Sequence, residues 1–266
     1  MKPTWMIQTN MDGVDNRPMI AEIKTQGMNV IPIRLKRLSE IDFTGYNTHG
    51  CILCYGDIDF VRQVRARAPF IPGAWCNFGN MKCSTYYAHL GEHLLNKQYI
   101  MMPVGDLPRR WTEMSVEWDG GWLFVRPDSG AKPFTGFVVK PDEQHRIESL
   151  IAAIGPETLV VVAPEKQIDA EWRFVICNGK VVTGCRYLPD ESTFFPRSSF
   201  RLAQAIASCK WQPDICYTVD IAESCGETYL LEINSFSCAG LYMCDLESIV
   251  REVSIAAIEE WKEYYV

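Results

Sequence analysis

The chain has no long apolar run and no excess of basic residues. Its longest clear apolar run, over residues 159–163, is far shorter than the roughly 20 residues that a membrane-spanning helix requires. Residues 1–5 show no apolar segment or cleavage site typical of a secretion signal. The 26 basic and 33 acidic residues give a net charge of −7, so no overall positive field attracts nucleic acid. We therefore expect a soluble cytoplasmic protein without a membrane or nucleic-acid partner.

Several common motifs are also absent. The sequence has no G-x-x-x-x-G-K-[ST], no G-x-G-x-x-G and no G-x-S-x-G string, which excludes the usual P-loop, dinucleotide-binding and serine-hydrolase arrangements. Cysteine is plentiful, but the eleven cysteines are odd in number, irregularly spaced and mostly set in apolar segments. A disulfide framework is therefore not expected, and we predict reduced thiols in the core.

The first part of the chain alternates short apolar runs with helical patterns. Strands are expected over residues 5–9, 29–34 and 51–55, and helices over residues 17–26 and 58–68. Such alternation is typical of a small parallel sheet. With 47% hydrophobic residues the chain has enough apolar material for a core. We predict an α/β domain over residues 1–78.

The pattern of the middle part predicts an α+β subdomain, which we assign to residues 79–157. The expected elements are a helix over 82–96, a loop over 103–108, strands over 122–126 and 136–140 around a loop at 127–135, and a helix over 143–154. The Pro and Gly residues of the 103–108 passage are the reason for expecting a loop there.

The last part, residues 158–266, contains two hairpins. A strand over 158–163 is followed by strands 171–177 and 180–187, a helix over 199–210, strands 217–222 and 228–234, and a helix over 245–264. The first hairpin turns at Asn178-Gly179, the dipeptide most typical of a tight turn in which both positions have positive φ.

The second hairpin carries a set of oxygen ligands. Glu232 and Asn234 are two apart on one strand, so their side chains leave the same face, while Leu231 and Ile233 point to the other. Asp220 lies on the partner strand. Such oxygen ligands suit Mg²⁺, which takes its remaining ligands from water and phosphates. The alternative is an ordinary solvated sheet face, but the apolar neighbours favour a buried site.

This hairpin resembles the magnesium-binding end of the ATP-grasp superfamily. In that family, an Asp or Glu on one strand and a Glu-x-Asn pair on the next hold the metal ions that bridge the nucleotide phosphates. The resemblance covers approximately residues 80–262, and its most specific part is the Asp220 and Glu232-x-Asn234 ending. It implies an ATP-grasp fold, of mixed α/β and α+β class, with a small N-terminal α/β domain.

Three further segments follow in the family's order and imply roles for individual residues. Residues 124–127 and the following loop resemble the phosphate-covering segment, residues 158–164 the strand that leads to the adenine hinge, and residues 171–174 with the next hairpin the ribose and phosphoryl segment. The resemblance implies that the nucleotide is held by Arg126, Lys132, Val162, Ala163 and Glu171, and that the transferred phosphoryl group is steadied by Arg173 and Arg186. Arg126 stands where many family members have Lys, and the covering loop has a single glycine.

The activity implied is that of an ATP- and Mg²⁺-dependent ligase. Such a ligase joins a carboxylate to an amine through an acyl phosphate, and either substrate belongs to a small molecule or a peptide. Two alternatives stay open at this point. One is an ATP-grasp kinase or phosphotransferase with the same residues and a different acceptor, and the other is a nucleotide-binding interaction module without catalysis.

A competing motif, H-x-x-E-H, begins at His89. In zinc hydrolases with this motif two histidines on one helical face bind the metal and the glutamate activates water. Here these would be His89, His93 and Glu92, with Glu165 or Glu171 as third ligand. Packed or solvent-facing histidines are the favoured interpretation, because so short a motif arises easily by chance. Likewise Cys51 and Cys54, which could form a redox or zinc pair, are interpreted as part of a core strand.

Overall fold

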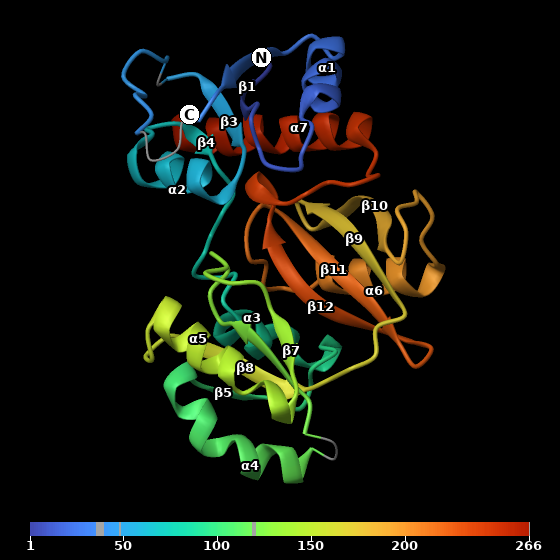
Figure 1. Ribbon diagram of the computed structural model, residues 1–266. Helices are drawn as coiled ribbons and strands as arrows, with labels where there is room; N and C mark the ends of the chain where they lie inside the picture. Colours follow the sequence, from blue (N-terminus) through green and yellow to red (C-terminus); the bar gives the residue numbers. More distant parts are fainter. Residues whose placement is uncertain (36–39, 48, 119–120, 266) are drawn as a thin grey trace.

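The computed structural model describes residues 1–35, 40–47, 49–118 and 121–265, and within these ranges the strands form three four-stranded sheets. The sheets follow one another along the molecule (Figure 1). The N-terminal sheet lies at one end, the sheet of residues 170–235 lies in the middle, and the sheet of residues 100–164 lies at the other end. The observed mixture of α/β and α+β parts confirms the predicted fold class.

The N-terminal sheet is parallel, as predicted. Its strands in spatial order are β2 (Asn29–Ile33), β1 (Thr4–Gln8), β3 (Cys51–Tyr55) and β4 (Ile71–Gly73). The two helices that connect them are α1 (Arg17–Thr25) and α2 (Ile58–Arg67). Asp57 caps α2, because its side chain accepts a hydrogen bond from the amide of Phe60.

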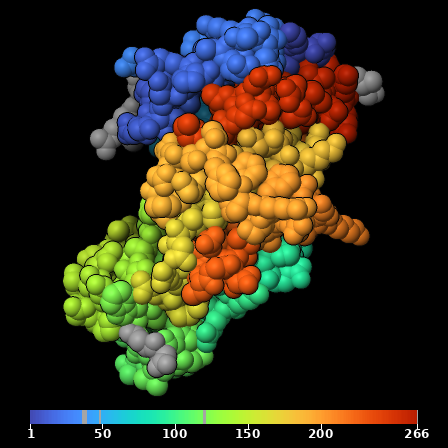
Figure 2. All heavy atoms as spheres, turned by 90° about the vertical axis from the view of Figure 1, so that its right-hand side faces the viewer, coloured from blue at the N-terminus to red at the C-terminus, as the bar shows by residue number. Residues whose placement is uncertain are grey.

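The last helix of the chain, α7 (Leu246–Tyr265), packs against this first sheet. Trp5 of β1 donates its indole N–H to Ser254 Oγ at 3.0 Å, and Trp75 donates to Glu260. Both views show the N-terminal segment side by side with α7 (Figures 1 and 2). The two ends of the chain therefore share one apolar core, although the sequence assigns α7 to the third predicted part.

The sheet at the far end is antiparallel. Its strands in spatial order are β5 (Ile100–Pro103), β8 (Leu159–Pro164), β6 (Leu123–Pro127) and β7 (Phe137–Val139), and it packs on α4 (Leu107–Glu117) and α5 (His145–Ile154). Strand β8 pairs with β5 and β6 inside this sheet, although the expected boundary after residue 157 assigns it to the next part. The division of the chain at 78 and 157 into domains stays a prediction.

The predicted loop over residues 103–108 was wrong. Residues Val104–Asp106 form a 3₁₀ turn, and Leu107 begins the α4 helix. Pro108 lies in the first helical turn, where the missing N–H costs nothing and the fixed φ favours the helix. Leu107, Trp111 and Met114 then bury one face at helical spacing. Proline here starts a helix instead of breaking one.

The middle sheet is antiparallel, with the spatial order β10 (Lys180–Leu188), β9 (Ala170–Cys177), β11 (Cys216–Ser224) and β12 (Glu227–Ser235). The two predicted hairpins are confirmed, with Asn178 and Gly179 both at positive φ. One face of the sheet packs on α6 (Arg197–Ala207) and α3 (Cys83–Leu90). The other face is apolar where it meets the N-terminal core, and charged further along.

The cysteines agree with the prediction from composition. All eleven cysteines are free thiols, and all but Cys209, Cys225 and Cys238 are buried, as expected for core thiols. Within the described ranges no helix has both the length and the apolarity to cross a membrane.

Phe236 lies where the middle sheet meets the N-terminal sheet. It is fully buried, and its ring centroid lies 6.5 Å from that of Trp5, 5.8 Å from that of Tyr55 and 6.2 Å from that of Trp75. It directly follows the strand that carries Glu232 and Asn234, so this packing fixes the end of β12.

Phe236→Ala should therefore destabilise the chain by about 3–5 kcal/mol, because it removes a ring from a filled core and leaves a cavity. Chemical denaturation followed by tryptophan fluorescence measures the change. Val116→Ala is the control, because the Val116 side chain is largely exposed on α4 and its loss should change stability by only about 0.5 kcal/mol. A loss below about 1 kcal/mol for Phe236→Ala would contradict this packing role.

Candidate active site

A cluster of buried charges lies where the far-end sheet meets the middle sheet. Arg126 on β6 reaches across to β12, where Nη2 donates to Glu232 Oε2 at 2.9 Å and Nη1 donates to the Leu231 carbonyl at 3.3 Å. Lys132, from the loop after β6, donates from Nζ to Glu232 Oε1 at 2.9 Å. The Glu232 carboxylate on the middle sheet thus pairs with two cations, one from the far-end sheet and one from the loop that follows β6.

A second ion pair lies beside it on the middle sheet. Asp220 on β11 is directly opposite both Glu232 on β12 and Arg173 on β9. Arg173 binds Asp220 in a bidentate fork, with Nε to Oδ1 at 2.7 Å and Nη2 to Oδ2 at 2.6 Å. Asn234 joins the two pairs, since Nδ2 donates to Asp220 at 3.2 Å and to Glu232 at 2.9 Å.

The three predicted metal ligands therefore lie together, in contact with three of the four predicted phosphate-binding cations. The sequence reasoning from strand alternation explains why: Glu232 and Asn234 share a face, and register places Asp220 opposite. Their assignment as metal ligands stays a prediction, since the contacts show proximity and charge, not occupancy.

The electrostatics of the cluster follow from burial and pairing. Burial alone would raise the pKa of Glu232, but Lys132 and Arg126 lower it by more, so its pKa lies far below the ordinary value. Burial raises the pKa of Asp220, and Arg173 opposes that shift. Within the cluster three cations face two carboxylates, which leaves a surplus positive charge in a partly dry site.

Two tyrosines that the sequence reasoning missed enclose Arg173. The rings of Tyr187 and Tyr242 stack with centroids 4.7 Å apart, and the Arg173 guanidinium lies 5.5 Å and 5.0 Å from them respectively. The Tyr187 hydroxyl also donates to Glu171. A register shift between Val181 and Thr183 in β10 places Cys185 opposite Arg173, so alternation puts Tyr187 on the same face as Arg173. The sequence pattern gives no signal for this shift.

Glu171, the predicted ribose ligand, lies at the edge of this aromatic group. It is partly buried on β9, and burial raises its pKa, which the Tyr187 hydrogen bond partly offsets. Val162 and Ala163 are fully buried on β8, a strand paired on both sides, so neither residue is open to a ligand in this structure. The nucleotide roles of all three stay predictions.

Arg186 is the predicted site residue that the structure places away from the cluster. It is opposite Trp172, which belongs to the core on the α6 side of the sheet, whereas its neighbour Cys185 is opposite Arg173. Its guanidinium hydrogen-bonds Asp190, at 2.8 Å to the carboxylate. Its predicted role in phosphoryl transfer therefore gains no support from these contacts.

The H-x-x-E-H alternative does not assemble. Helix α3 ends at Leu90 and a 3₁₀ turn follows, so His89 and His93 do not share one face of a continuous helix. His89 stacks on Trp211 with centroids 4.3 Å apart. Across the part of the chain that the structure describes, no three His, Cys, Asp or Glu residues are grouped to hold a metal ion. Cys51 and Cys54 lie buried in β3, as expected for a core strand.

Comparison with known proteins agrees with this fold. The structure resembles the ATP-grasp ligase PsnB in complex with a minimal precursor, with a TM-score of 0.62 at 13% identity, over 97% of this chain and 100% of that chain. It resembles D-alanine–D-alanine ligase from Bacillus anthracis with a TM-score of 0.58 at 16% identity, over 99% of each chain. It resembles the D-cycloserine synthetase DcsG with a TM-score of 0.61 at 12% identity, over 96% of this chain and 99% of that chain.

These identities are too low to carry more than the fold, which is that of the ATP-grasp proteins. The family described as "ATP-grasp domain, R2K clade family 2" matches residues 100–251, more than half of the chain. The chain belongs to this family, and the predicted membership of the ATP-grasp superfamily is confirmed. A search of curated protein sequences finds no match.

Glu232→Gln should change how stability depends on pH. The folded pKa of Glu232 lies below its ordinary value of 4.5, so the stabilisation is complete above that pH and is lost as the pH falls toward the folded pKa. Between about pH 6 and about pH 3 the wild-type chain should lose roughly 2 kcal/mol relative to Glu232→Gln. Urea denaturation at each pH measures the difference, with the exposed Glu227→Gln as control. A difference that stays constant over this range would refute the assigned ionisation.

Proposed function

We propose that this chain is an ATP- and Mg²⁺-dependent ligase that joins a carboxylate to an amine. The observation that carries the proposal is the cluster of Arg126, Lys132 and Arg173 against Asp220 and Glu232, at the meeting of two sheets in an ATP-grasp fold. Such a cluster holds cations for phosphate oxygens and carboxylates for a divalent metal at the same place.

The donor chemistry of the cluster fits magnesium. Asp220 and Glu232 supply carboxylate oxygens, and Asn234 supplies an amide whose rotation by half a turn would present Oδ1 in place of Nδ2. These hard oxygen donors suit Mg²⁺, which binds few protein carboxylates and takes its other ligands from water and phosphates. When bound, the metal would neutralise charge on the phosphate oxygens.

The cations fit a triphosphate. Arg126 and Lys132 would engage phosphate oxygens, and Arg173 would steady the transferred phosphoryl group, whose charge is spread over its equatorial oxygens in the transition state. Each of these cations is now paired with a carboxylate. Binding of the metal nucleotide would exchange partners, with phosphates replacing carboxylates on the cations, so that no buried charge is left unpaired.

The reaction needs no protein nucleophile. An oxygen of the substrate carboxylate attacks the γ-phosphorus, the bond from that phosphorus to the bridging oxygen breaks, and ADP leaves with an acyl phosphate remaining. The neutral amine then attacks the acyl carbon, the carbon–oxygen bond to phosphate breaks, and the amine loses a proton. Charge stabilisation by Arg173 and positioning by the two sheets are the contributions of this chain.

Product analysis separates this reaction from the other ATP-grasp activities. ADP and phosphate that appear only when an acid and an amine are both present mark a ligase. A stable phosphorylated product marks a kinase or phosphotransferase. Magnesium-dependent ATP binding without turnover, over a broad panel of acids and amines, marks a nucleotide-binding module, and either of these last two results contradicts the ligase proposal.

Glu232→Gln and Asp220→Asn should each lower ATP turnover by roughly 100-fold or more, because each removes a negative oxygen from the proposed metal site. Release of ADP with saturating Mg²⁺ measures the effect. Glu227→Gln is the matched control, since it makes the same change on the same strand at an exposed position outside the cluster. Unchanged turnover in either cluster variant shows the metal assignment to be wrong.

A further inference from the structure

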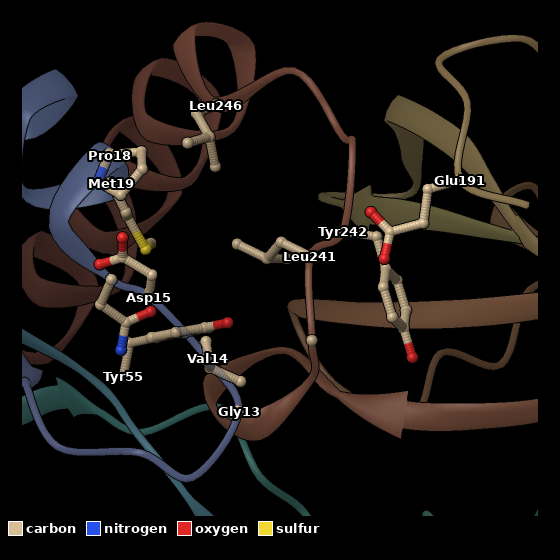
Figure 3. A pocket seen from close by; sticks show the side chains of 12 residues that line it. Gly13, Val14, Asp15, Pro18, Met19, Tyr55, Glu191, Leu241, Tyr242 and Leu246 are labelled. Atoms are coloured by element: carbon tan, nitrogen blue, oxygen red, sulfur yellow. The ribbon is translucent and has the colours of Figure 1, made fainter.

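A cavity of about 310 Å³ opens beside Arg173, between the N-terminal sheet and the middle sheet. One wall comes from the loop before α1 and from α1 itself, and the other from the segment after β12 together with the loop after β10 (Figure 3). Its volume is at the lower end of the range for small-molecule sites, about 300–1,000 Å³. The cavity is therefore large enough for a substrate of a few carbon atoms.

The cavity is continuous with the proposed active site. Gly240 lines it, and the Gly240 carbonyl accepts a hydrogen bond from Arg173 Nη1 at 2.8 Å. Tyr242 also lines it, and its ring lies against the Arg173 guanidinium. A molecule in the cavity would thus extend toward the group proposed to hold the transferred phosphoryl.

The charged groups of the cavity are acidic. Figure 3 shows Asp15 and Glu191 on opposite walls. None of the described residues that line it is Lys, Arg or His. The hydrogen bond from Arg17 lowers the pKa of Asp15 to about 2, so Asp15 is ionised. Glu191 forms no ion pair with any described residue. A carboxylate would be repelled here, whereas an ammonium group would be attracted.

Between the two carboxylates the lining is apolar. Met19, Leu241 and Leu246 point toward the space between the walls (Figure 3), and such surface favours a hydrocarbon chain. The combination of acidic ends and an apolar middle selects a flexible alkyl chain that carries a positive charge.

We infer that this cavity binds the amine substrate of the proposed ligase, and that this substrate is an alkylammonium: an amine joined by an apolar chain to a second amino group. The inference rests on the proposed function. Asp15 holds one amino group as the ammonium ion, and Glu191, on the opposite wall beside Tyr242, accepts a hydrogen bond from the other. The other, neutral amino group attacks the acyl carbon, the bond from that carbon to phosphate breaks, and the attacking nitrogen releases a proton. An aliphatic diamine and a lysine with a free α-amino group share this chemistry.

Calorimetric titration of the full chain with 1,5-diaminopentane tests the inference without ATP or acid substrate. Hexanoate, of similar length but opposite charge, is the comparison ligand. The double variant Asp15→Asn with Glu191→Gln should weaken diamine binding roughly tenfold, and Arg17→Gln should strengthen it roughly threefold because it frees Asp15 from its partner. Glu227→Gln is the control and should bind as the wild type does. Lysine amide, in which both the α- and the ε-amino group are free, distinguishes a lysine from a plain diamine as the source.

The outcomes separate the cavity from the proposed function. Diamine binding that weakens in the double variant, while the affinity for ATP with Mg²⁺ stays unchanged, supports the inference. Equal diamine binding in wild type and double variant, or tighter binding of hexanoate than of either amine, overturns it even if ATP binds. A wild-type chain that binds no ATP with Mg²⁺ contradicts the proposed function instead.

Discussion

The structure depends on the pairing of buried charges, within the middle sheet and between that sheet and the far-end sheet. Asp220 is 1% exposed, and Arg173 compensates its charge with a bidentate fork. Glu232 compensates the charges of Arg126, on the far-end sheet, and of Lys132, in the loop that follows β6. Leaving one partner of such a pair uncompensated costs about 3–5 kcal/mol, so these groups can separate only when other charges replace their partners. A metal nucleotide, the ligand proposed for this cluster, brings both signs of charge at once and would replace both kinds of partner.

The rest of the fold positions this cluster. On the charged face of the middle sheet, the apolar half packs against the N-terminal sheet and α7. This packing fixes the end of β12 that carries Asn234, and β12 pairs with the stretch of β11 that carries Asp220. Phe236 and the residues after it lead from β12 past Arg173 to the cavity. The same segment therefore connects the core, the charge cluster and the proposed amine pocket, so a substrate in the pocket would lie next to the groups proposed to bind the phosphoryl group.

Local patterns explain which features could be predicted. Strand alternation places Glu232 and Asn234 on one face, and the Asn178-Gly179 turn marks a hairpin, so both could be read from neighbouring residues. Pairing between distant segments has no such local signal. The pairing of β8 with β5 and the packing of α7 on the N-terminal core are of this kind. A register shift between Val181 and Thr183 in β10 places Tyr187 on the face of Arg173 and Arg186 on the opposite face, where Arg186 bonds Asp190, and the sequence does not reveal this shift.

The most direct measurement is a crystal structure with a non-hydrolysable ATP analogue and Mg²⁺. We expect the metal on oxygens of Asp220, Glu232 and Asn234. We expect the phosphates on Arg126, Lys132 and Arg173, with the carboxylate partners of these cations exchanged. Nucleotide bound elsewhere, or bound here with the Arg173–Asp220 and Arg126–Glu232 pairs intact and no metal between the carboxylates, would contradict the central claim.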